Sequence, residues 1–400
     1  MGGRRPMKIL MLHPHDLHYF PWTIRIIRLG QELVRAGHRV TIGYVEFAYK
    51  DKAYYEKVIR PELPPEMNYL EFKPRARHFF SILKQLKQVC PGVDLVHVQK
   101  CFSQVTLPGL FLAYRMDCPI HYDWDDNESG LGHEWIKFRP ALWEIKLYER
   151  ILPRLVDSMS FASEALRQKA LRLGVPDEDL FPAPVGADLE AFRPERDGRA
   201  VRDRYDLGEG PVVMYMGQLG GAAYANLLLD AIPLVLREEP GTRFFVVGGG
   251  RRLEALMEQA KDLGIGDKVT FSGYVEQERV PDYVAAADVA VATFEDNEIT
   301  RCKSPLKIAE YLAAGKPIVA TDVGDVPRMI EGGGQLVRPG SVEDFAGAIV
   351  RYVRDPELRK RHGEVGRRRA EQTYNWQATG RSLLRAYERA FEKRGRTMPK

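Results

Sequence analysis

The chain has 400 residues, of which 44% are hydrophobic and 28% are charged, and its formal net charge is +4. These values are ordinary for a globular protein of about two or three domains. The mild and diffuse positive charge argues against nucleic-acid binding, which needs a concentrated basic stripe.

Neither end of the compositional scale suggests a membrane or disulfide-rich protein. No apolar run reaches the length of about 18 residues that a transmembrane helix needs, and the start of the chain lacks the apolar core of a signal peptide. The four cysteines form no C-x-x-C pair, so neither a zinc site nor a disulfide scaffold is expected. We therefore expect a cytoplasmic protein with reduced thiols.

Short apolar runs alternate with helical periodicity through the first half of the chain. Strands are predicted at Lys8–Leu12, Arg39–Val45, Asp94–Val98 and Pro119–Asp123. A helix is predicted from Trp22 to Ala36, because Gly37 is a typical C-terminal stop. The alternation predicts a parallel sheet covered by helices, and we expect a first Rossmann-like domain over residues 1–190.

The second half repeats this alternation. The charged, Gly- and Pro-rich stretch 186–210 is predicted to be a linker. After it, a helix is predicted from Tyr224 to Glu238, and strands at Pro211–Met216, Arg243–Val247, Lys268–Ser272, Val289–Ala292 and Pro317–Ala320. We expect a second domain over 191–375, and a C-terminal helix over 376–400 that crosses back to the first domain.

The predicted fold class is therefore α/β, with two doubly wound Rossmann-like parallel-sheet domains facing each other across a cleft. In open sheets of this kind, ligands bind beyond the carboxyl ends of the strands. This inference concerns the place of a site and not yet its chemistry.

The segment from Arg301 to Pro317 carries the clearest chemical signal. Ser304 is predicted to cap a helix whose first residue is Pro305 and which stops at Gly315. The free amides of a helix start, together with its dipole, form an anion site.

Charged residues of this segment strengthen the prediction. Arg301, Lys303 and Lys307 add positive charge near the helix start. Glu310 lies three residues after Lys307, on the same side of the helix, where it would accept hydrogen bonds from sugar hydroxyls. The alternative is an ordinary capped surface helix with a Lys–Glu pair.

The sequence from Glu310 to Gly324 resembles the donor-site signature of family 4 of the retaining glycosyltransferases. Five further pieces resemble other parts of that family in the same order, namely Ser163–Arg167, Pro184–Asp188, Phe192–Pro194, Phe271–Val275 and Tyr374–Trp376. The resemblance implies GT-B architecture and a nucleotide-diphospho-sugar donor held by the second domain. It also implies an acceptor held by the first domain, retention at the reacting carbon, and neither a metal nor a further cofactor.

The same resemblance implies roles for individual residues. Glu310 would bind the donor ribose, and the helix start at Ser304 and Pro305 would meet the diphosphate. The residues implied to bind the donor are Gln218, Gly248, Val275, Lys303, Ser304, Pro305, Leu306 and Glu310. Those implied to act in catalysis are Asp125, Asp126 and Lys307.

The chain departs from the family pattern on the donor side. The family has a second Glu eight residues before the ribose Glu, but Cys302 stands there, followed by a Ser-Pro-x-Lys type of loop. The Arg and Lys that normally hold the diphosphate are replaced by Gln218 and Ala223. Losing one group that stabilises a leaving group costs about 3–4 kcal/mol. We therefore hypothesise that Lys303 and Lys307 supply the missing positive charge.

The first domain also departs from the pattern. His13, His15 and His18 follow the first strand in place of the usual Gly-Gly turn, and they are candidates for acceptor binding, or are merely solvated. Asp125 stands where the family has a His, and Asp126 matches the family Asp. The D-x-D run that ends at Asp125 would suggest a metal in a different glycosyltransferase fold, which the two-domain pattern disfavours.

Several readings remain open. The stretch from His78 to Gln88 is predicted to be an amphipathic helix that covers the sheet or contacts an anionic bilayer. The Gly248–Gly250 turn lacks the full dinucleotide spacing, so a dehydrogenase is a distant alternative, and an epimerase lacks a clear acid–base pair. The main alternative is a non-catalytic GT-B protein that binds a nucleotide sugar or a partner.

Overall fold

The computed structural model describes residues 5–18, 23–45, 62–73, 79–89, 91–136, 139–220 and 225–399. The chain divides into two compact units. Unit 1 contains Met1–Pro184 and Trp376–Lys400, and unit 2 contains Val185–Asn375.

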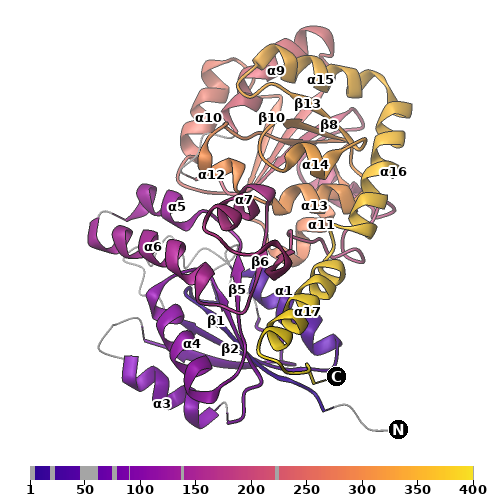
Figure 1. Ribbon diagram of the computed structural model, residues 1–400. Coiled ribbons are helices and arrows are strands. Elements are labelled where there is room, and N and C mark those ends of the chain that lie inside the picture. The colour runs from indigo at the N-terminus through magenta and orange to yellow at the C-terminus, as the bar shows by residue number, and fades with distance from the viewer. Residues whose placement is uncertain are drawn as a thin grey trace. The chain divides into compact units, whose positions relative to one another are not determined.

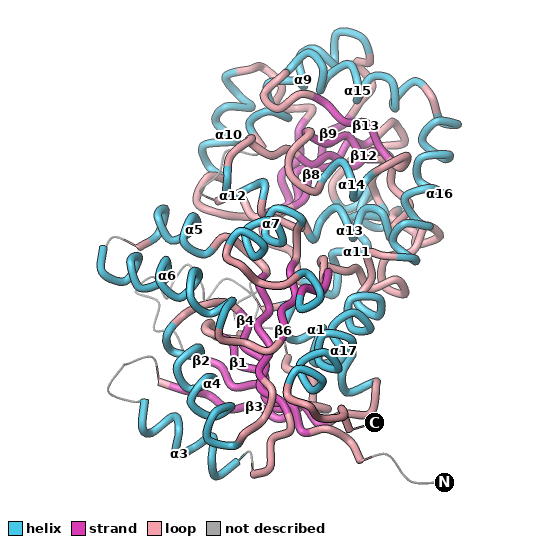
Figure 2. Tube along the Cα trace, in the orientation of Figure 1, coloured by secondary structure: helices cyan, strands magenta, loops and turns pink. Residues whose placement is uncertain are grey.

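The described strands of unit 1 form one parallel sheet with the order β3-β2-β1-β4-β5-β6-β7 (Figure 2). Their apolar residues are continuous because both faces of a parallel sheet are covered. The strands are β1 Lys8–His13, β2 Arg39–Val45, β3 Asn68–Phe72, β4 Leu95–Gln99, β5 Ile120–Trp124, β6 Ser158–Phe161 and β7 Leu180–Pro182.

Helices cover both faces of this sheet (Figure 1). Helices α3, α4 and α6 lie on one side, and α1 and α17 pack together on the other. The helices of unit 1 are α1 Ile24–Arg35, α3 Phe79–Val89, α4 Ser103–Met116, α5 Glu128–Trp135, α6 Arg139–Ile151, α7 Glu164–Arg172 and α17 Trp376–Lys393.

Unit 2 repeats the arrangement with the strand order β10-β9-β8-β11-β12-β13. Its described strands are β8 Val212–Met216, β9 Arg243–Val247, β10 Val269–Gly273, β11 Val289–Ala292, β12 Ile318–Thr321 and β13 Gly334–Val337. Its described helices are α8 Arg199–Arg204, α9 Asn226–Glu238, α10 Leu253–Asp262, α11 Val280–Ala285, α12 Glu298–Arg301, α13 Leu306–Ala313, α14 Val326–Ile330, α15 Val342–Arg354 and α16 Pro356–Gln372.

Alternation along β8 fills two separate cores in unit 2. Met214 and Met216 pack in one core with residues of α13 and α14. Val213 and Tyr215 pack in the other core with residues of α9 and α15, because successive side chains of a strand point to opposite faces. The strand is therefore anchored on both sides, which fixes the turn that follows it.

Each sheet has a point at which the strand order reverses. In unit 1 it lies between β1 and β4, and in unit 2 between β8 and β11. Chain connections leave to opposite sides there, which opens a crevice at the carboxyl ends of the two strands. Both points bear residues that the sequence analysis singled out.

The predicted fold class of two Rossmann-like parallel-sheet units is confirmed. The predicted linker is wrong, because residues 199–204 form α8, Val201 and Leu207 are buried in a core, and Arg202 bonds Asp288. This stretch belongs to unit 2. Helix α17 has the predicted range but packs on β5, β6 and β7 of unit 1.

The stretch from His78 to Gln88 contains α3, whose Ile82, Leu83 and Leu86 are buried. Its described part is thus an amphipathic helix that covers the sheet; His78 lies outside the described residues. Within the described ranges, no helix is both long and apolar enough to cross a membrane.

Candidate functional site

The turn after β8 lies against the turn after β9 in unit 2. Gly217 donates its N–H to Val247 O (2.9 Å), and Leu219 donates to Gly249 O (2.8 Å). A Cβ at Gly248 would lie 2.0 Å from Gly217 O. The predicted close backbone approach of Gly248 therefore exists, but its partner is the protein's own backbone.

Lys307, in the first turn of α13, reaches this turn. Its ammonium lies 4.1 Å from the centre of the Tyr215 ring and 5.8 Å from that of Phe294. These rings follow β8 and β11, the two strands on either side of the reversal point, and both contacts fit cation–π geometry. A Cβ at Gly217 would come within 2.7 Å of Lys307 Nζ, so the missing side chain at Gly217 leaves room for the ammonium.

The surroundings of Lys307 change its protonation. Burial, together with the neighbouring Lys303, lowers the pKa of Lys307 to about 7, and Glu310 opposes the shift. An ammonium in such a place lacks full hydration, so an anion beside it would be stabilised strongly. Lys307 therefore sits where a charged phosphate would favour its protonated form.

Helix α13 is held firmly behind this position. Glu310 is 4% exposed and Tyr311 is fully buried. The Tyr311 hydroxyl accepts a hydrogen bond from Met216 N–H (2.8 Å), and thus links α13 to the end of β8. Glu310 lies one helical turn beyond Lys307, as predicted.

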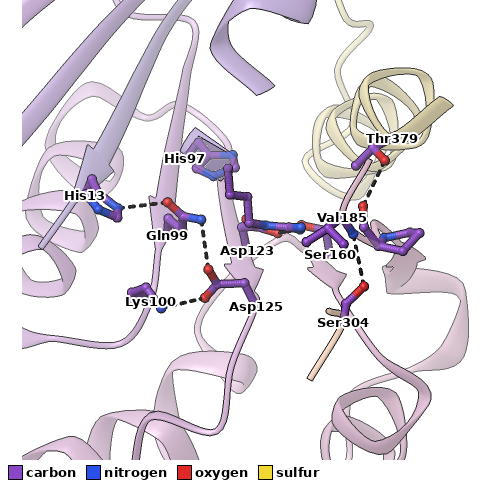
Figure 3. A network of polar contacts seen from close by, with 12 residues as sticks. His13, His97, Gln99, Lys100, Asp123, Asp125, Ser160, Val185, Ser304 and Thr379 are labelled. Carbon is purple, nitrogen blue, oxygen red and sulfur yellow. Dashed lines mark hydrogen bonds and ion pairs between the residues drawn. The ribbon is translucent and has the colours of Figure 1, made fainter. Parts of the chain in front are cut away.

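Two predictions for this segment are wrong. Ser304 does not cap the helix, because α13 begins at Leu306 after an extended Pro305 without a side-chain cap. The Ser304 hydroxyl instead accepts from Val185 N–H (3.1 Å; Figure 3). Arg301 is exposed and bonds both oxygens of Asp296, so a nearby carboxylate already takes its charge.

The other donor-side candidates differ in burial. Pro305 is buried, Lys303 and Leu306 are partly buried, and Gln218 is exposed at the turn after β8. Val275 is partly buried and packs against the core of unit 2. Ala223 lies outside the described residues. Cys302, at the position of the family's second Glu, is 1% exposed and offers no carboxylate.

In unit 1, a chain of polar contacts spans the reversal point between β1 and β4. His13 Nδ1 lies 2.8 Å from Gln99 Oε1, and Gln99 Nε2 donates to Asp125 Oδ2 (3.1 Å). Lys100 Nζ lies 3.1 Å from Asp125 Oδ1 and also contacts Glu128 (Figure 3). The contacts join the ends of β1, β4 and β5.

These contacts determine the state of His13. A carboxylate only accepts hydrogen bonds, so Gln99 must turn its NH₂ to Asp125 and its oxygen to His13. His13 Nδ1 therefore carries the proton, and Nε2 has the free electron pair. Burial, with His15 and Lys100, lowers the pKa of His13 well below its usual value, so the ring is neutral. Nε2 is buried and has no partner among the described residues.

Lys100 is held in an unusual backbone conformation, with φ of 65°. This left-handed region is uncommon for residues other than glycine. Burial opposes the charge, but Asp125 and Glu128 together raise the pKa of Lys100. Burial raises the pKa of Glu128 to about 7 although Lys100 opposes it. The cluster keeps the Asp125 carboxylate beside a fixed cation.

Asp123 does not belong to a metal site. Its two oxygens accept from Arg25 Nε and NH2, both at 2.7 Å, and Oδ1 also contacts Ser160. Both Asp123 and Arg25 are buried, so the pair stabilises the sheet against α1. No group of three or more His, Cys, Asp or Glu side chains that could hold a metal occurs in the described part of the chain.

The remaining first-domain candidates lie near His13 to different degrees. The rings of His13 and His15 are 5.4 Å apart, edge to face, and burial lowers the pKa of His15 to about 3. Asp126 follows Asp125 at the end of β5. His18 instead lies 6.2 Å from the Tyr44 ring and is partly exposed.

Sequence analysis missed Gln99, Lys100 and Glu128. The first two follow the predicted strand Asp94–Val98 directly, at the end where parallel sheets bind ligands. That position was the available signal. Their pairing with His13 and Asp125 depends on strand order, which a single sequence does not reveal.

Two family models match the chain. Residues 23–191 match the model described as Glycosyltransferase Family 4. Residues 210–355 match the model described as Glycosyl transferases group 1. The two matches are consecutive and fall mainly on unit 1 and on unit 2, respectively.

Named relatives share this family. The chain is 31% identical over 232 residues to the GDP-mannose-dependent alpha-(1-6)-phosphatidylinositol monomannoside mannosyltransferase of Mycolicibacterium smegmatis, covering 57% of this chain and 61% of the relative. It is 26% identical over 311 residues to the MMP alpha-(1->4)-mannosyltransferase of Mycolicibacterium hassiacum, covering 74% and 71%. The chain thus spans about three fifths of the first relative's length.

Solved structures share the fold. Anabaena HepE, in complex with UDP and glucose, matches with a TM-score of 0.73 at 19% identity, over 94% of this chain and 98% of that chain. Sucrose-phosphate synthase from Thermosynechococcus elongatus matches with a TM-score of 0.72 at 20% identity, over 96% and 99%. On the two family matches and the fold of both units, the chain belongs to the GT-B glycosyltransferases of family 4.

Proposed function

We propose that this protein is a retaining, metal-independent glycosyltransferase that moves a sugar from a nucleotide-diphospho-sugar to an acceptor hydroxyl. The observation that carries the proposal is the position of Lys307. Its ammonium lies against the turn after β8 and beside the ring of Tyr215, in the crevice where this fold binds ligands.

The donor half of the reaction belongs to unit 2 in this proposal. The leaving diphosphate lies between the first turn of α13 and the Gly217 turn, where the helix dipole and the Lys307 ammonium stabilise its growing charge. Glu310, one turn further, receives the hydroxyls of the ribose. Lys303 adds a second positive charge. These two lysines replace the cations that the family has at Gln218 and Ala223.

The acceptor half belongs to unit 1. The neutral His13 offers Nε2 as an acceptor to the incoming hydroxyl, with Asp125 and Asp126 close by in sequence to orient hydroxyls of the sugars. The hydroxyl attacks on the face that the diphosphate leaves, and the departing phosphate takes its proton, which gives retention. The relatives named above act on mannosyl donors, so GDP-mannose is the first donor to test.

The test is a thermal-shift screen of nucleoside diphosphates and their sugars, followed by assays of nucleoside diphosphate release with candidate acceptors. We expect a stabilising donor, turnover that EDTA leaves unchanged, and a product whose anomeric configuration by NMR equals that of the donor. Binding without release for any acceptor would favour the non-catalytic alternative. An inverted product or loss of activity with EDTA would contradict the mechanism.

A further inference from the structure

A cavity of about 370 Å³ lies in unit 1, away from the contacts described above. The end of β5, the start of α5 and the helices α6 and α7 form its walls. Figure 1 shows α5 and α6 side by side, and the two helices pack together. The volume falls within the range of about 300–1,000 Å³ that is typical of small-molecule sites.

The lining of this cavity is strongly basic. Lys146 and Arg150 lie one turn apart on α6, and Lys169 and Arg172 lie one turn apart at the end of α7. Lys146, Arg150 and Arg172 form no ion pair with any other described residue. Cations with this arrangement on two helices repel each other, and an anion between them removes that repulsion.

The negative charge in the lining is already in use. Glu149 is buried and accepts a hydrogen bond from the Ser129 hydroxyl. It therefore fastens the start of α5 to α6. The basic side chains of the cavity keep their charge available for a ligand.

A second observation points to a ligand independently of charge. Trp124 is 1% exposed, lies in the wall of the cavity, and stacks on Tyr122 with ring centres 5.9 Å apart. Its indole N–H is buried and has no hydrogen-bond partner among the described residues. Native proteins rarely leave a buried N–H unpaired, because the loss is costly. A ligand oxygen in the cavity would satisfy it.

We infer that this cavity is a second anion site, which binds a phosphate group carried by a molecule other than the sugar donor. Phosphate oxygens accept from several donors at once, and arginine matches them in a bidentate way. Leu173 and the Trp124 ring add an apolar wall, which suits a phosphate attached to a larger body. Trp124 directly precedes Asp125 on the chain, so the site lies at the same sheet edge as the acceptor contacts.

Two sources of such a phosphate are possible, a soluble phosphorylated molecule and a lipid headgroup. The wild-type protein is titrated with inorganic phosphate by calorimetry, and is co-sedimented with phosphatidylcholine vesicles that contain or lack phosphatidic acid. Saturable binding of phosphate alone supports a soluble source. Binding only to vesicles with phosphatidic acid supports a headgroup. Absence of binding in both arms overturns the inference.

Variants separate this site from general surface charge. The double variant Arg150→Gln/Arg172→Gln is expected to weaken binding about 10- to 100-fold, since two charge-assisted contacts are lost. Trp124→Phe is expected to weaken it about 3- to 10-fold. The matched control Arg381→Gln/Arg385→Gln, on exposed positions of α17, is expected to stay within twofold.

The result also stays distinct from the proposed function. Lys307→Ala should abolish donor turnover but leave phosphate or vesicle binding unchanged. Equal weakening by the α17 control, or loss of binding in Lys307→Ala, would overturn the assignment to this cavity.

Discussion

Lys307 is the residue on which the chemistry of unit 2 depends. Its pKa is lowered from 10.5 to about 7, mainly by burial. Below pH 7 the free enzyme therefore carries an ammonium at this position, and above it the neutral amine. Stabilisation of a diphosphate requires the ammonium, so the charge is lost as pH rises.

A pH profile follows from this shift. The kcat/KM for the donor, which reports groups of the free enzyme, is expected to fall as pH rises through about 7. Lys307→Arg keeps its charge because arginine does not deprotonate in this range. The variant should therefore lose the alkaline limb, whatever its absolute rate. The same limb in both proteins would show that another group titrates.

His13 is the corresponding residue of unit 1. Its Nδ1 is held by Gln99, and its Nε2 is left as a buried acceptor. His13→Phe keeps a ring of similar size and removes that acceptor. We expect the acceptor KM to rise about 10- to 100-fold, as for the loss of one buried hydrogen bond, with donor hydrolysis unchanged.

The control for His13 is His18→Phe. His18 is partly exposed and contacts the Tyr44 ring, so its removal should change the acceptor KM by less than about threefold. An equal effect of both substitutions would place the acceptor elsewhere or reflect a general disturbance of the loop.

At the scale of elements, α13 depends on α16. Helix α16 approaches α13 so closely that a Cβ at Gly363 would lie 2.1 Å from Gly315 O. Gly315 ends α13 with φ of 62°, a conformation that favours glycine. The close approach fixes the axis along which Lys307 and Glu310 are presented.

A pair of glycine substitutions tests this dependence. Gly363→Ala should destabilise the protein by about 2–3 kcal/mol through overpacking and slow donor turnover, because α13 must shift. Gly347→Ala on α15 has open space around the added Cβ, and should stabilise the protein by about 0.5–1 kcal/mol. Urea unfolding measures both changes, and a neutral Gly363→Ala would refute the packing argument.

At the scale of the whole molecule, α17 completes unit 1. The Tyr387 hydroxyl lies 2.8 Å from His97 Nδ1 under the sheet, and Arg389 bonds the buried Asp179 (2.8 Å). Thr379 bonds Pro184 O (2.9 Å; Figure 3). Unit 1 is therefore built from both ends of the chain.

Removal of this helix should separate the two units in function. Truncation after Asn375 uncovers buried Leu383, Tyr387 and Phe391, so unit 1 should lose its protection in hydrogen exchange. Affinity for the nucleoside diphosphate, measured by calorimetry, should stay within about threefold, because the donor contacts belong to residues 185–375. Intact protection of β5 and β6 in the truncated protein would contradict this account.

The sequence predicts the buried parts of the fold better than its edges. Central strands such as β1 and β8 are continuous apolar runs, because helices cover both of their faces. The edge strands β3 and β13 were missed, since Asn68–Phe72 and Gly334–Val337 are only partly covered and mix polar with apolar residues.

The candidate site divides in the same way. Lys307 and Glu310 are close because they share a helix turn, which sequence spacing reveals. The contacts of His13 with Gln99 and of Ser304 with Val185 join distant segments, so spacing cannot predict them. Arg301 was misjudged because Asp296, only five residues away, competes for its charge.

The most direct measurement is the rate of nucleoside diphosphate release at saturating donor by Lys307→Ala, beside Lys360→Ala as a control on an exposed position of α16. Loss of the charge that stabilises the leaving group predicts a fall of about 100- to 1,000-fold, with the control at the wild-type rate. A wild-type rate in Lys307→Ala would contradict the central claim that this lysine carries the charge of the departing diphosphate.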